Sequence, residues 1–373
     1  MNKTIGIFGG GQLGRMMAQA ALPLNIQCSF FEAETDCPAA ILGPVFSSKN
    51  EHALQDFIAS ADVFSLEFEN TPVADVDVLT QTKTLHPPRL ALATAQNRLA
   101  EKSLFDELNI PVAPYRAVDS LESLKKAVAE LGLPIVLKTA TGGYDGKGQF
   151  VLRSEDQIDT AWAELGPAKS LIAESFVKFS REVSIIAVRG QDGDVKTWAL
   201  AENHHHNGIL SPSIVPAPNS TDLQPVAQDY ITRLLNHLNY VGVLTLELFV
   251  TEQGLYANEM ACRVHNSGHW SIEGAICSQF ENHIRAVAGL PLGSTDVVRP
   301  TVMINIIGQH PKSEDVLALK GAHLHLYNKS ERAGRKLGHI TLMPNNSDEL
   351  TMLCRQLAKI LPVPLALTDD MNL

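Results

Sequence analysis

The sequence predicts a chain of mixed α/β and α+β architecture that begins with a doubly wound parallel sheet. Its 373 residues are too many for one ordinary core, and 45% are hydrophobic while 19% are charged, the profile of a folded globular protein. Strand-like and helix-like segments alternate over the first hundred residues, which favours a parallel sheet with helices on both faces. Two glycine-rich segments and a later pair of apolar strands then carry the candidate chemistry.

The first part of the chain supplies the parallel sheet. Buried strands are expected at residues 5–8, 27–31 and 63–66, with a helix over about 13–21. One helix over about 94–108 closes this unit, and the prolines at 111 and 114 mark a linker.

The rest of the chain predicts a different architecture. Further strands are expected at 134–138, 150–152, 170–174 and 182–188, and a hairpin at 244–250 and 254–260. Beyond Pro300, strands near 302–306 and 322–326 precede a helix over about 348–360. No internal repeat or low-complexity tract interrupts this order.

Charge and cysteine content limit the partners and the compartment. The net charge of −11 argues against nonspecific nucleic-acid binding, although a local basic cluster can still bind an anionic substrate. The five cysteines lack metal-ligand spacing and are expected to be reduced thiols. No segment has the pattern of a signal peptide or a membrane span, so we expect a cytoplasmic protein without a membrane partner.

The first glycine cluster, residues 9–14, follows a strand and contains the spacing of a dinucleotide fingerprint. Glu32 ends the second predicted strand, where a ribose-binding acid of a nicotinamide or flavin enzyme would lie. Two other interpretations stay open. The helix N-terminus favours an anion of any kind, or the glycines form a tight turn without a ligand.

The second cluster, residues 141–149, holds four glycines and follows a strand that ends in Lys138. Exposed backbone N–H groups of such a loop suit phosphate oxygens, and Lys138 adds a fixed positive charge. The G-K-[ST] ending of a Walker A loop is absent. The alternative is a plain hairpin loop.

Two carboxylates, Glu247 and Glu259, lie in the apolar strands of the predicted hairpin. Burial of unpaired charges is costly, so they need a cation, either Mg²⁺ bridging nucleotide phosphates or a salt bridge to Arg263 or another cation. In the polar run at 263–270, Arg263 is suited to hold an oxyanion and His265 to move a proton. The alternative there is a loop of satisfied polar groups.

Three further patterns in the sequence are weaker. Backbone groups at 175–177 are suited to an adenine edge and a nearby acid to ribose, although surface carboxylates are common. The three consecutive histidines at 204–206 do not share one face, which argues against a three-histidine metal site. Four cations within eight positions favour a phosphate group, or else a solvated basic surface: Lys329, Arg332, Arg335 and Lys336.

Four motifs together resemble the N5-carboxyaminoimidazole ribonucleotide synthetases, which are ATP-grasp ligases: GGGQLGR at 9–15, TGGYDGKGQ at 141–149, NEMACRVHNSGHW at 258–270 and GRKLGH at 334–339. The resemblance runs from about residue 4 to 341. It implies an ATP-grasp fold with an N-terminal pre-ATP-grasp domain at 1–110, an ATP-grasp domain at 111–296 with a lid at about 112–177, and a C-terminal domain at 297–373. It also implies a homodimer.

The resemblance implies a reaction of purine biosynthesis. ATP phosphorylates bicarbonate to carboxyphosphate, and 5-aminoimidazole ribonucleotide captures the carboxyl group, leaving ADP and phosphate. Formate-dependent glycinamide ribonucleotide transformylase and biotin carboxylase are the nearest rivals, but Tyr144-Asp145 and His265-Asn266 favour the aminoimidazole enzyme. A nicotinamide-dependent dehydrogenase and a noncatalytic nucleotide-binding module are rivals from other classes.

The resemblance also implies a role for each matching residue. The ATP positions are Arg98, Lys138, Gly143, Tyr144, Asp145, Gly146, Lys147, Gly148, Gln149, Glu174, Ser175, Phe176, Val177, Glu182, His205, Asn258 and Glu259. Glu247 and Glu259 would bind two Mg²⁺ ions, or Mn²⁺ in their place. The catalytic positions are Arg263, His265, Asn266 and Asp145. The ribonucleotide positions are Gln12, Glu67, Tyr144, Asp145, Lys147, Ser267, Lys329, Arg332, Arg335 and Lys336, with Glu69 as a further contact.

Two positions depart from the pattern. Proline is common where Cys262 stands, and many wider ATP-grasp enzymes have a metal-ligating asparagine where this chain has Ala261. The turn before Arg263 is therefore expected to be less rigid, and the two glutamates need help from phosphates and water to hold the metal.

Overall fold

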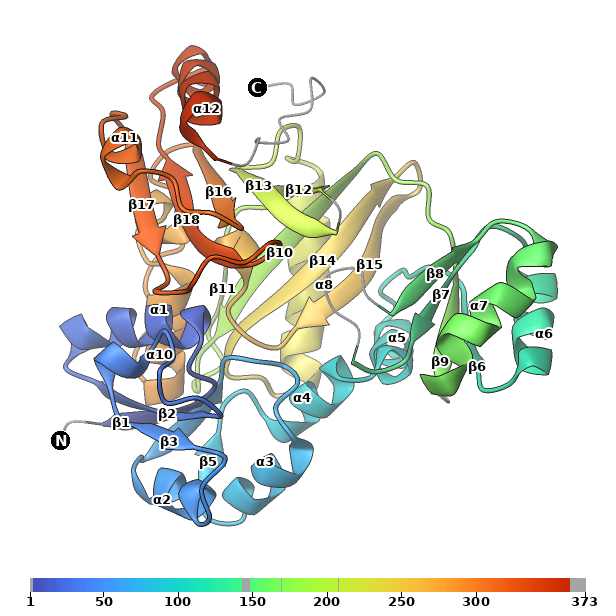
Figure 1. Cartoon of the computed structure of the whole chain (residues 1–373), viewed down its shortest axis with the longest axis horizontal. Coiled ribbons are helices and arrows are strands. Elements are labelled where there is room, and N and C mark those ends of the chain that lie inside the picture. Colours follow the sequence, from blue (N-terminus) through green and yellow to red (C-terminus); the bar gives the residue numbers. More distant parts are fainter. Residues whose placement is uncertain (1–2, 143–147, 169, 207, 363–373) are drawn as a thin grey trace.

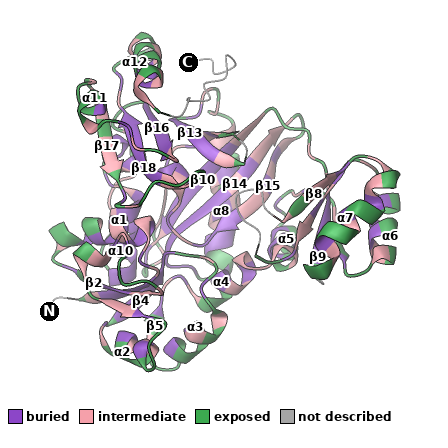
Figure 2. Ribbon diagram, viewed as in Figure 1, coloured by how far each residue is buried: buried purple, intermediate pink, exposed green. Residues whose placement is uncertain are grey.

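The computed structural model describes residues 3–142, 148–168, 170–206 and 208–362, which form three sheets (Figure 1). A parallel sheet lies at the N-terminus, a four-stranded sheet forms a projecting arm, and a nine-stranded sheet forms the body. Buried residues follow the large sheet and the helices α1 and α10, whereas the outer faces of the helices on the arm are exposed (Figure 2).

The N-terminal sheet has the order β3-β2-β1-β4-β5, and its strand pairs are all parallel. The predicted doubly wound unit is therefore confirmed. The helices of this unit are α1 (Gln12–Ala21), α2 (Ala53–Ala59) and α3 (Val73–Thr80). Its strands are β1 (Thr4–Phe8), β2 (Gln27–Glu32), β3 (Val45–Ser47), β4 (Val63–Leu66) and β5 (Thr84–Leu85).

The single helix predicted over 94–108 is wrong at its start. Two helices occupy this region, α4 (Arg89–Ala95) and α5 (Arg98–Glu107). Asn97 separates them in an extended conformation, and its side chain accepts hydrogen bonds from the backbone N–H groups of Leu99 and Ala100 at 3.0 and 3.4 Å. An N-cap of this kind starts a new helix, so α5 has its own direction.

The arm is a four-stranded antiparallel sheet of order β6-β9-β7-β8, covered by α6 (Leu121–Leu131) and α7 (Ile158–Leu165). Its strands lie within the interval expected for the lid: β6 (Tyr115–Val118), β7 (Ile135–Thr139), β8 (Gln149–Leu152) and β9 (Leu171–Ser175). The arm has an apolar core of its own. It is connected to the body through α5, because the N–H of Arg98 donates to the carbonyl of Ala140 at 2.9 Å.

The large sheet has the order β15-β14-β10-β12-β13-β16-β18-β17, with β11 (Val195–Thr197) beside β10. The predicted hairpin is confirmed, since β14 (Gly242–Thr251) pairs antiparallel with β15 (Gly254–Ala261). The strands between the arm and this hairpin are β10 (Arg181–Arg189), β12 (Ala201–His206) and β13 (Ile209–Val215). Helix α8 (Leu223–His237) packs on β10 and on the two strands of the hairpin.

The C-terminal segment continues the same sheet, because β16 (Thr301–Ile307) pairs with β13. Next to it lie β18 (Lys336–Leu342) and β17 (Ala322–Leu326), with α11 (Ser313–Leu317) and α12 (Ser347–Ile360). Strand β18 was not predicted, because its basic start is typical of a loop. Gly338 lies within this strand, and a Cβ there would lie 2.3 Å from the carbonyl oxygen of His325, so the position requires glycine.

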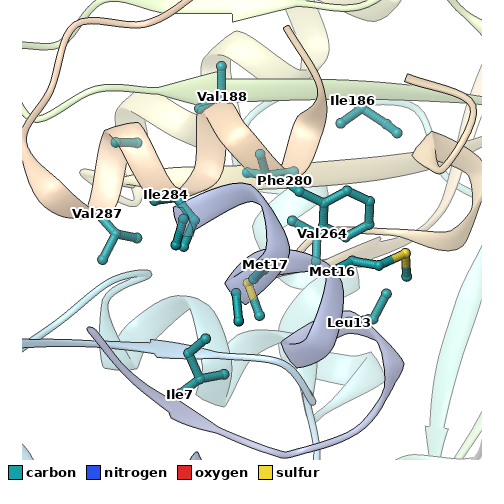
Figure 3. Packing of buried hydrophobic residues seen from close by; sticks show 14 of the residues in the cluster. Ile7, Leu13, Met16, Met17, Ile186, Val188, Val264, Phe280, Ile284 and Val287 are labelled. Carbon is teal, nitrogen blue, oxygen red and sulfur yellow. The ribbon is translucent and has the colours of Figure 1, made fainter. Parts of the chain in front are cut away.

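Helix α10 (Gln279–Ala288) joins the N-terminal sheet to the large sheet. Its residues Phe280, Ile284 and Val287 pack with Met17 of α1 and Val188 of β10 in one apolar cluster (Figure 3). His283 on the same helix accepts a hydrogen bond from the N–H of Val243 at Nδ1, 3.1 Å, and its Nε2 lies 2.7 Å from the hydroxyl of Ser65. The two sheets are therefore held in a fixed relation.

Candidate active site

A cleft of about 1010 Å³ lies where the three parts of the chain meet. Its lining combines residues from the glycine turn after β1, the arm, the hairpin and the C-terminal segment. Predicted site residues that line it are Gln12, Glu67, Glu69, Arg98, Lys138, Gln149, Glu182, His205, Glu247, Asn258, Glu259, Arg263, His265, Asn266, Lys329, Arg332, Arg335 and Lys336. The fold thus brings together positions more than 300 residues apart in sequence.

Other predicted residues lie elsewhere. Gly143, Tyr144, Asp145, Gly146 and Lys147 lie outside the described residues. Gly148, Glu174, Ser175, Phe176, Val177 and Ser267 are not part of the cleft lining. Ser175 and Phe176 donate their backbone N–H groups to the carbonyls of Pro114 and Pro134, at 2.8 and 3.1 Å.

The glycine turn at residues 9–14 holds an anion of the chain itself. Glu67, which follows β4, accepts hydrogen bonds from the N–H groups of Gly11 and Leu13 at 2.5 and 3.0 Å. A Cβ on Gly11 would lie 2.3 Å from its carboxylate. Burial raises the pKa of Glu67, while the N–H groups oppose that shift.

The dinucleotide interpretation of this turn is therefore wrong. Glu67 occupies the helix N-terminus that a pyrophosphate would need. Glu32 accepts a hydrogen bond from the N–H of Gly10 at 3.0 Å. The turn needs glycines because the side chains of Glu32 and Glu67 approach its backbone too closely for a further side chain to fit.

Glu247 and Glu259 face each other across the hairpin. They are directly paired in the register of β14 and β15. The register shifts next to this pair, since Leu248 is opposite Ala257, so Asn258 is an extra residue in β15. Such a bulge re-aims side chains, and both Asn258 and Glu259 line the cleft.

The electrostatics of the pair call for a cation. Burial and the negative charge of Glu247 raise the pKa of Glu259, and burial together with Glu259 raises the pKa of Glu101 to about 8. Burial opposes ionisation of Glu247 as well, but the hydrogen bond and charge of His265 lower its pKa to about 2. Nε2 of His265 lies 3.1 Å from Glu247, and the guanidinium of Arg98 lies 3.6 Å from Glu259.

The donor set fits Mg²⁺. Hard carboxylate oxygens on adjacent strands are ligands that Mg²⁺ accepts, and it commonly keeps waters and nucleotide phosphates as the remaining ligands. Across the described residues, no group of three or more His, Cys, Asp or Glu side chains could hold a metal by itself. A metal at this pair therefore needs ligands from the substrate or from water, as expected from Ala261.

A chain of hydrogen bonds fixes His265. The amide of Asn203 donates to Ser184 at 2.9 Å, and Ser184 donates to Ser267 at 2.8 Å. Ser267 lies 2.8 Å from Nδ1 of His265, which also accepts from the N–H of Ser267 at 3.3 Å. Nδ1 is thus an acceptor, so Nε2 carries the hydrogen that faces Glu247.

Arg263 is held by Glu69, which comes from the loop after β4. The guanidinium donates through Nε and Nη2 to the two oxygens of Glu69, and Nη1 donates to the carbonyl of Val264 at 3.0 Å. Burial disfavours charge on Glu69, but Arg263 outweighs it and lowers the pKa of that carboxyl. Asn266 beside it exchanges amide hydrogen bonds with Asn305, at 3.0 and 2.8 Å.

At the arm end of the cleft, Lys138 of β7 lies 2.6 Å from Glu174 of β9. Burial opposes ionisation of Glu174, yet Lys102 and Lys138 lower its pKa. On the opposite wall, His205 lies 3.4 Å from Glu182, and this carboxylate raises the pKa of His205 against the effect of burial.

Neighbouring histidines have different partners. His204 lies 3.1 Å from Glu202, and His206 is exposed. The expectation that the three consecutive histidines do not share one face is confirmed.

The basic cluster belongs to the same cleft. Lys329, Arg332, Arg335 and Lys336 all line it. Lys329 donates to the side-chain oxygen of Gln12 and so joins the C-terminal segment to α1. Burial lowers the pKa of Lys329, and Arg335 donates to the hydroxyl of Ser330 at 2.9 Å. The cluster is therefore part of the cleft wall and not a detached basic surface.

Glu101 and Lys102 of α5 were not among the predicted site residues. Both are buried, and Glu101 lines the cleft. A signal was present, because helical spacing places these charges on the same face as Leu104 and Phe105, the buried face of α5. Charged residues on a buried helix face need partners and often serve a site.

Fold and site together define an ATP-grasp enzyme: an antiparallel arm with a lysine, a carboxylate pair on a neighbouring hairpin, and a cleft between them. The ATP-grasp domain model matches residues 103–280, and the ribonucleotide synthetase preATP-grasp domain model matches residues 1–96. The model of the phosphoribosylaminoimidazole carboxylase C-terminal domain matches residues 301–352.

The relatives specify the family. N5-carboxyaminoimidazole ribonucleotide synthase of Pseudomonas aeruginosa is 47% identical over 91% of this chain and 94% of its own length. The synthase of Bacillus subtilis is 43% identical, over 93% of each chain. The chain belongs to the N5-carboxyaminoimidazole ribonucleotide synthase family.

Solved structures agree. The synthetase from Thermus thermophilus is similar with a TM-score of 0.92 and 44% identity, covering 96% of this chain and 99% of the other. The Aspergillus clavatus enzyme in complex with ADP and 5-aminoimidazole ribonucleotide is similar with a TM-score of 0.89 and 30% identity, covering 96% and 98%. In the described part of this chain, no helix is both long enough and apolar enough to span a membrane.

Proposed function

We propose that this chain catalyses ATP- and bicarbonate-dependent carboxylation of 5-aminoimidazole ribonucleotide to N5-carboxyaminoimidazole ribonucleotide, with carboxyphosphate as the intermediate. One observation carries the proposal. A single cleft is lined by Lys138, by the Glu247–Glu259 pair and by the Lys329–Lys336 basic cluster. That combination matches the needs of a nucleotide, a metal ion and a phosphorylated second substrate.

ATP would lie between the arm and the large sheet. Lys138 and the N–H groups of the loop 141–149 would contact its phosphates, Arg98 would add a positive charge, and Glu182 with His205 would face its ribose. Glu174 to Val177 would border the adenine, and Asn258 would assist the metal ligand Glu259. Glu247 and Glu259 would hold Mg²⁺, which would supply charge neutralisation for the transferring phosphoryl group.

Arg263 would hold bicarbonate and then carboxyphosphate. Its guanidinium has five N–H donors, and the hydrogen bonds to Glu69 and Val264 use three of them among the described residues. The remaining two donors suit the two oxygens of a carboxylate-like anion. Asn266 would line the same pocket, and Ser267, which lies outside the lining, would support it by holding His265. Exclusion of water there would protect carboxyphosphate from hydrolysis.

The ribonucleotide would occupy the basic end. Lys329, Arg335 and Lys336 would contact its 5′-phosphate, with Arg332 beside them. Gln12 and Glu67 would border the sugar and base. Tyr144, Asp145 and Lys147, from the loop outside the described residues, would face the aminoimidazole.

We assign the proton of the reacting amine to Asp145, which the resemblance implies to face the aminoimidazole, whereas Nε2 of His265 lies 3.1 Å from Glu247. His265 would then orient Glu247. On this assignment Asp145→Asn abolishes turnover, whereas His265→Gln raises the Mg²⁺ requirement. The reverse pattern would return the proton transfer to His265.

The test is ADP formation by the purified chain with ATP, Mg²⁺ and bicarbonate, with and without 5-aminoimidazole ribonucleotide. Stimulation that needs both bicarbonate and the ribonucleotide supports the function. ATP binding without turnover would indicate a noncatalytic module, and stimulation by biotin or by formate with glycinamide ribonucleotide would indicate a related ligase.

A homodimer in the cytoplasm completes the proposal. Light scattering should give twice the chain mass of 40.5 kDa. A value equal to one chain would contradict the dimer.

A further inference from the structure

β15 is the edge strand of the large sheet, so its outward backbone groups have no strand partner, and two adjacent side chains of α5 bind three of these groups around the bulge. Lys102 donates from Nζ to the carbonyls of Ala257 and Asn258, at 3.3 and 2.9 Å. Glu101 accepts a hydrogen bond from the N–H of Met260 at 2.6 Å. The two side chains therefore bind the backbone immediately before and immediately after Glu259.

The contacts surround the bulge. Asn258 is the extra residue of β15, and it interrupts the alternation of buried and less buried positions, so that Asn258 and Glu259 are both less buried and both line the cleft. A bulge without partners for its backbone groups would be free to slip, and a shift of one residue in a strand reverses which face each side chain points to. A slip here would turn Glu259 away from Glu247.

Lys102 also reaches the arm. Its Nζ lies 3.5 Å from Glu174, which in turn lies 2.6 Å from Lys138. The side chains of Lys102 and Glu174 are 3% and 6% exposed, so water screens this contact little. One carboxylate thus links the lysine of the arm to the lysine that holds the bulge, across the junction between the two sheets.

We propose that Glu101 and Lys102 are positioning residues that fix the Asn258–Glu259 bulge in register and tie it to Lys138 through Glu174. This inference rests on the proposed function of Glu259 as a metal ligand and Lys138 as a phosphate contact. The position of the metal ligand and that of the phosphate lysine are then set by one helix. Neither Glu101 nor Lys102 needs to touch the substrates for this role.

Substitutions of similar size test it. Lys102→Met and Glu101→Leu remove the partners of the bulge, whereas Glu101→Gln keeps a carbonyl oxygen that accepts from Met260. Lys126→Met on the exposed α6 and Glu107→Gln on the exposed side of α5 are matched controls, since their side chains are 77% and 65% exposed. Each variant is first compared with the wild type in thermal unfolding.

The main readout is binding of ADP with and without Mg²⁺, measured by calorimetry on the folded variants. Lys102→Met and Glu101→Leu should weaken Mg²⁺-dependent ADP binding by about tenfold or more. Both should also raise the KM for ATP and the Mg²⁺ concentration for half-maximal rate, with the KM for the ribonucleotide unchanged. Glu101→Gln should keep the wild-type ADP affinity, KM for ATP and Mg²⁺ requirement. The controls Lys126→Met and Glu107→Gln should keep them as well.

Two results would overturn the proposal. One is a loss of thermal stability with unchanged Mg²⁺-dependent ADP binding, which assigns the pair a structural role only. The other is an equal rise of KM for ATP and the ribonucleotide. Because ADP binding needs no turnover, a wild type that binds Mg²⁺–ADP but is not stimulated by the ribonucleotide would instead refute the proposed function.

Discussion

Replacement of Arg263 by methionine should abolish turnover but leave ATP binding nearly intact. If its two remaining N–H donors stabilise the oxyanion of carboxyphosphate, their loss costs at least the roughly 10²–10³-fold in kcat seen for one oxyanion donor, about 3–4 kcal/mol. The KM for ATP should change by less than about tenfold, or about 1.4 kcal/mol. The reason is that, among the described residues, the guanidinium of Arg263 hydrogen-bonds to Glu69 and Val264, and neither of these belongs to the arm.

The same change also has a structural cost. It leaves Glu69 without its cation, and breaking a buried ion pair from one side costs about 3–5 kcal/mol. The lower end of that range applies, because the Glu69 side chain is 28% exposed. The double variant Arg263→Met with Glu69→Leu removes both charges and should recover most of the free energy of unfolding.

The double variant therefore separates the two roles. We expect it to unfold close to the wild-type urea midpoint and still to form ADP at least 100-fold more slowly. Arg116→Met is the matched arginine control, since Arg116 forms an exposed pair with Glu130 on the arm. A stable double variant that keeps more than a tenth of the wild-type turnover would refute the oxyanion role of Arg263.

Three further predictions concern Lys336 and Glu259 in the cleft and His283 in helix α10. Lys336→Ala should raise the KM for the ribonucleotide and leave the KM for ATP unchanged in steady-state assays; an equal rise for ATP would place Lys336 at the wrong substrate. Glu259→Gln should raise the Mg²⁺ concentration for half-maximal rate at least as much as loss of an outer-shell partner does, about 10–100-fold, while Glu252→Gln at the exposed hairpin turn should not. Burial lowers the pKa of His283 to about 3. The folded protein therefore keeps this imidazole neutral while the unfolded chain, whose histidine pKa is near 6.5, takes up a proton. The contribution of His283 to stability is present above about pH 6.5 and is lost as the pH falls below that value. Between pH 7 and 5 the stability of the wild type relative to His283→Gln should fall by about 2 kcal/mol in urea unfolding; a gap that does not change with pH would contradict the buried neutral state.

Residue patterns predicted those parts of the fold that depend on local periodicity. The buried run at residues 5–8 and the apolar pair of strands around Glu247 and Glu259 gave the parallel sheet and the hairpin. The boundary at Asn97 was missed because a helix pattern continues on both sides of it, and only the side-chain cap separates α4 from α5. Strand β18 was missed because Gly338 and a basic start are typical of loops, whereas the close approach of His325 requires the glycine.

The candidate site was likewise predicted only where the signal is local in the sequence. Residue chemistry alone predicted Lys138 as a phosphate contact, Glu247 as a metal ligand and Arg263 as an oxyanion contact, and the resemblance supplied the substrates. Sequence could not show that the anion at the glycine turn is Glu67, because that contact joins residues more than fifty positions apart. The bulge at Asn258 left a faint trace, since the spacing of the buried residues Leu255, Ala257 and Met260 changes from two to three.

The most direct test of the central claim is the fate of oxygen from labelled bicarbonate. If the cleft joins bicarbonate to the γ-phosphoryl group of ATP, a bicarbonate oxygen attacks phosphorus and stays with it when the carboxyl group leaves. Turnover with ¹⁸O-bicarbonate, ATP and 5-aminoimidazole ribonucleotide should therefore transfer one ¹⁸O atom to each phosphate released, as read by mass spectrometry. Phosphate without the label, formed at the same rate as ADP, would show that water attacks ATP and would contradict the account.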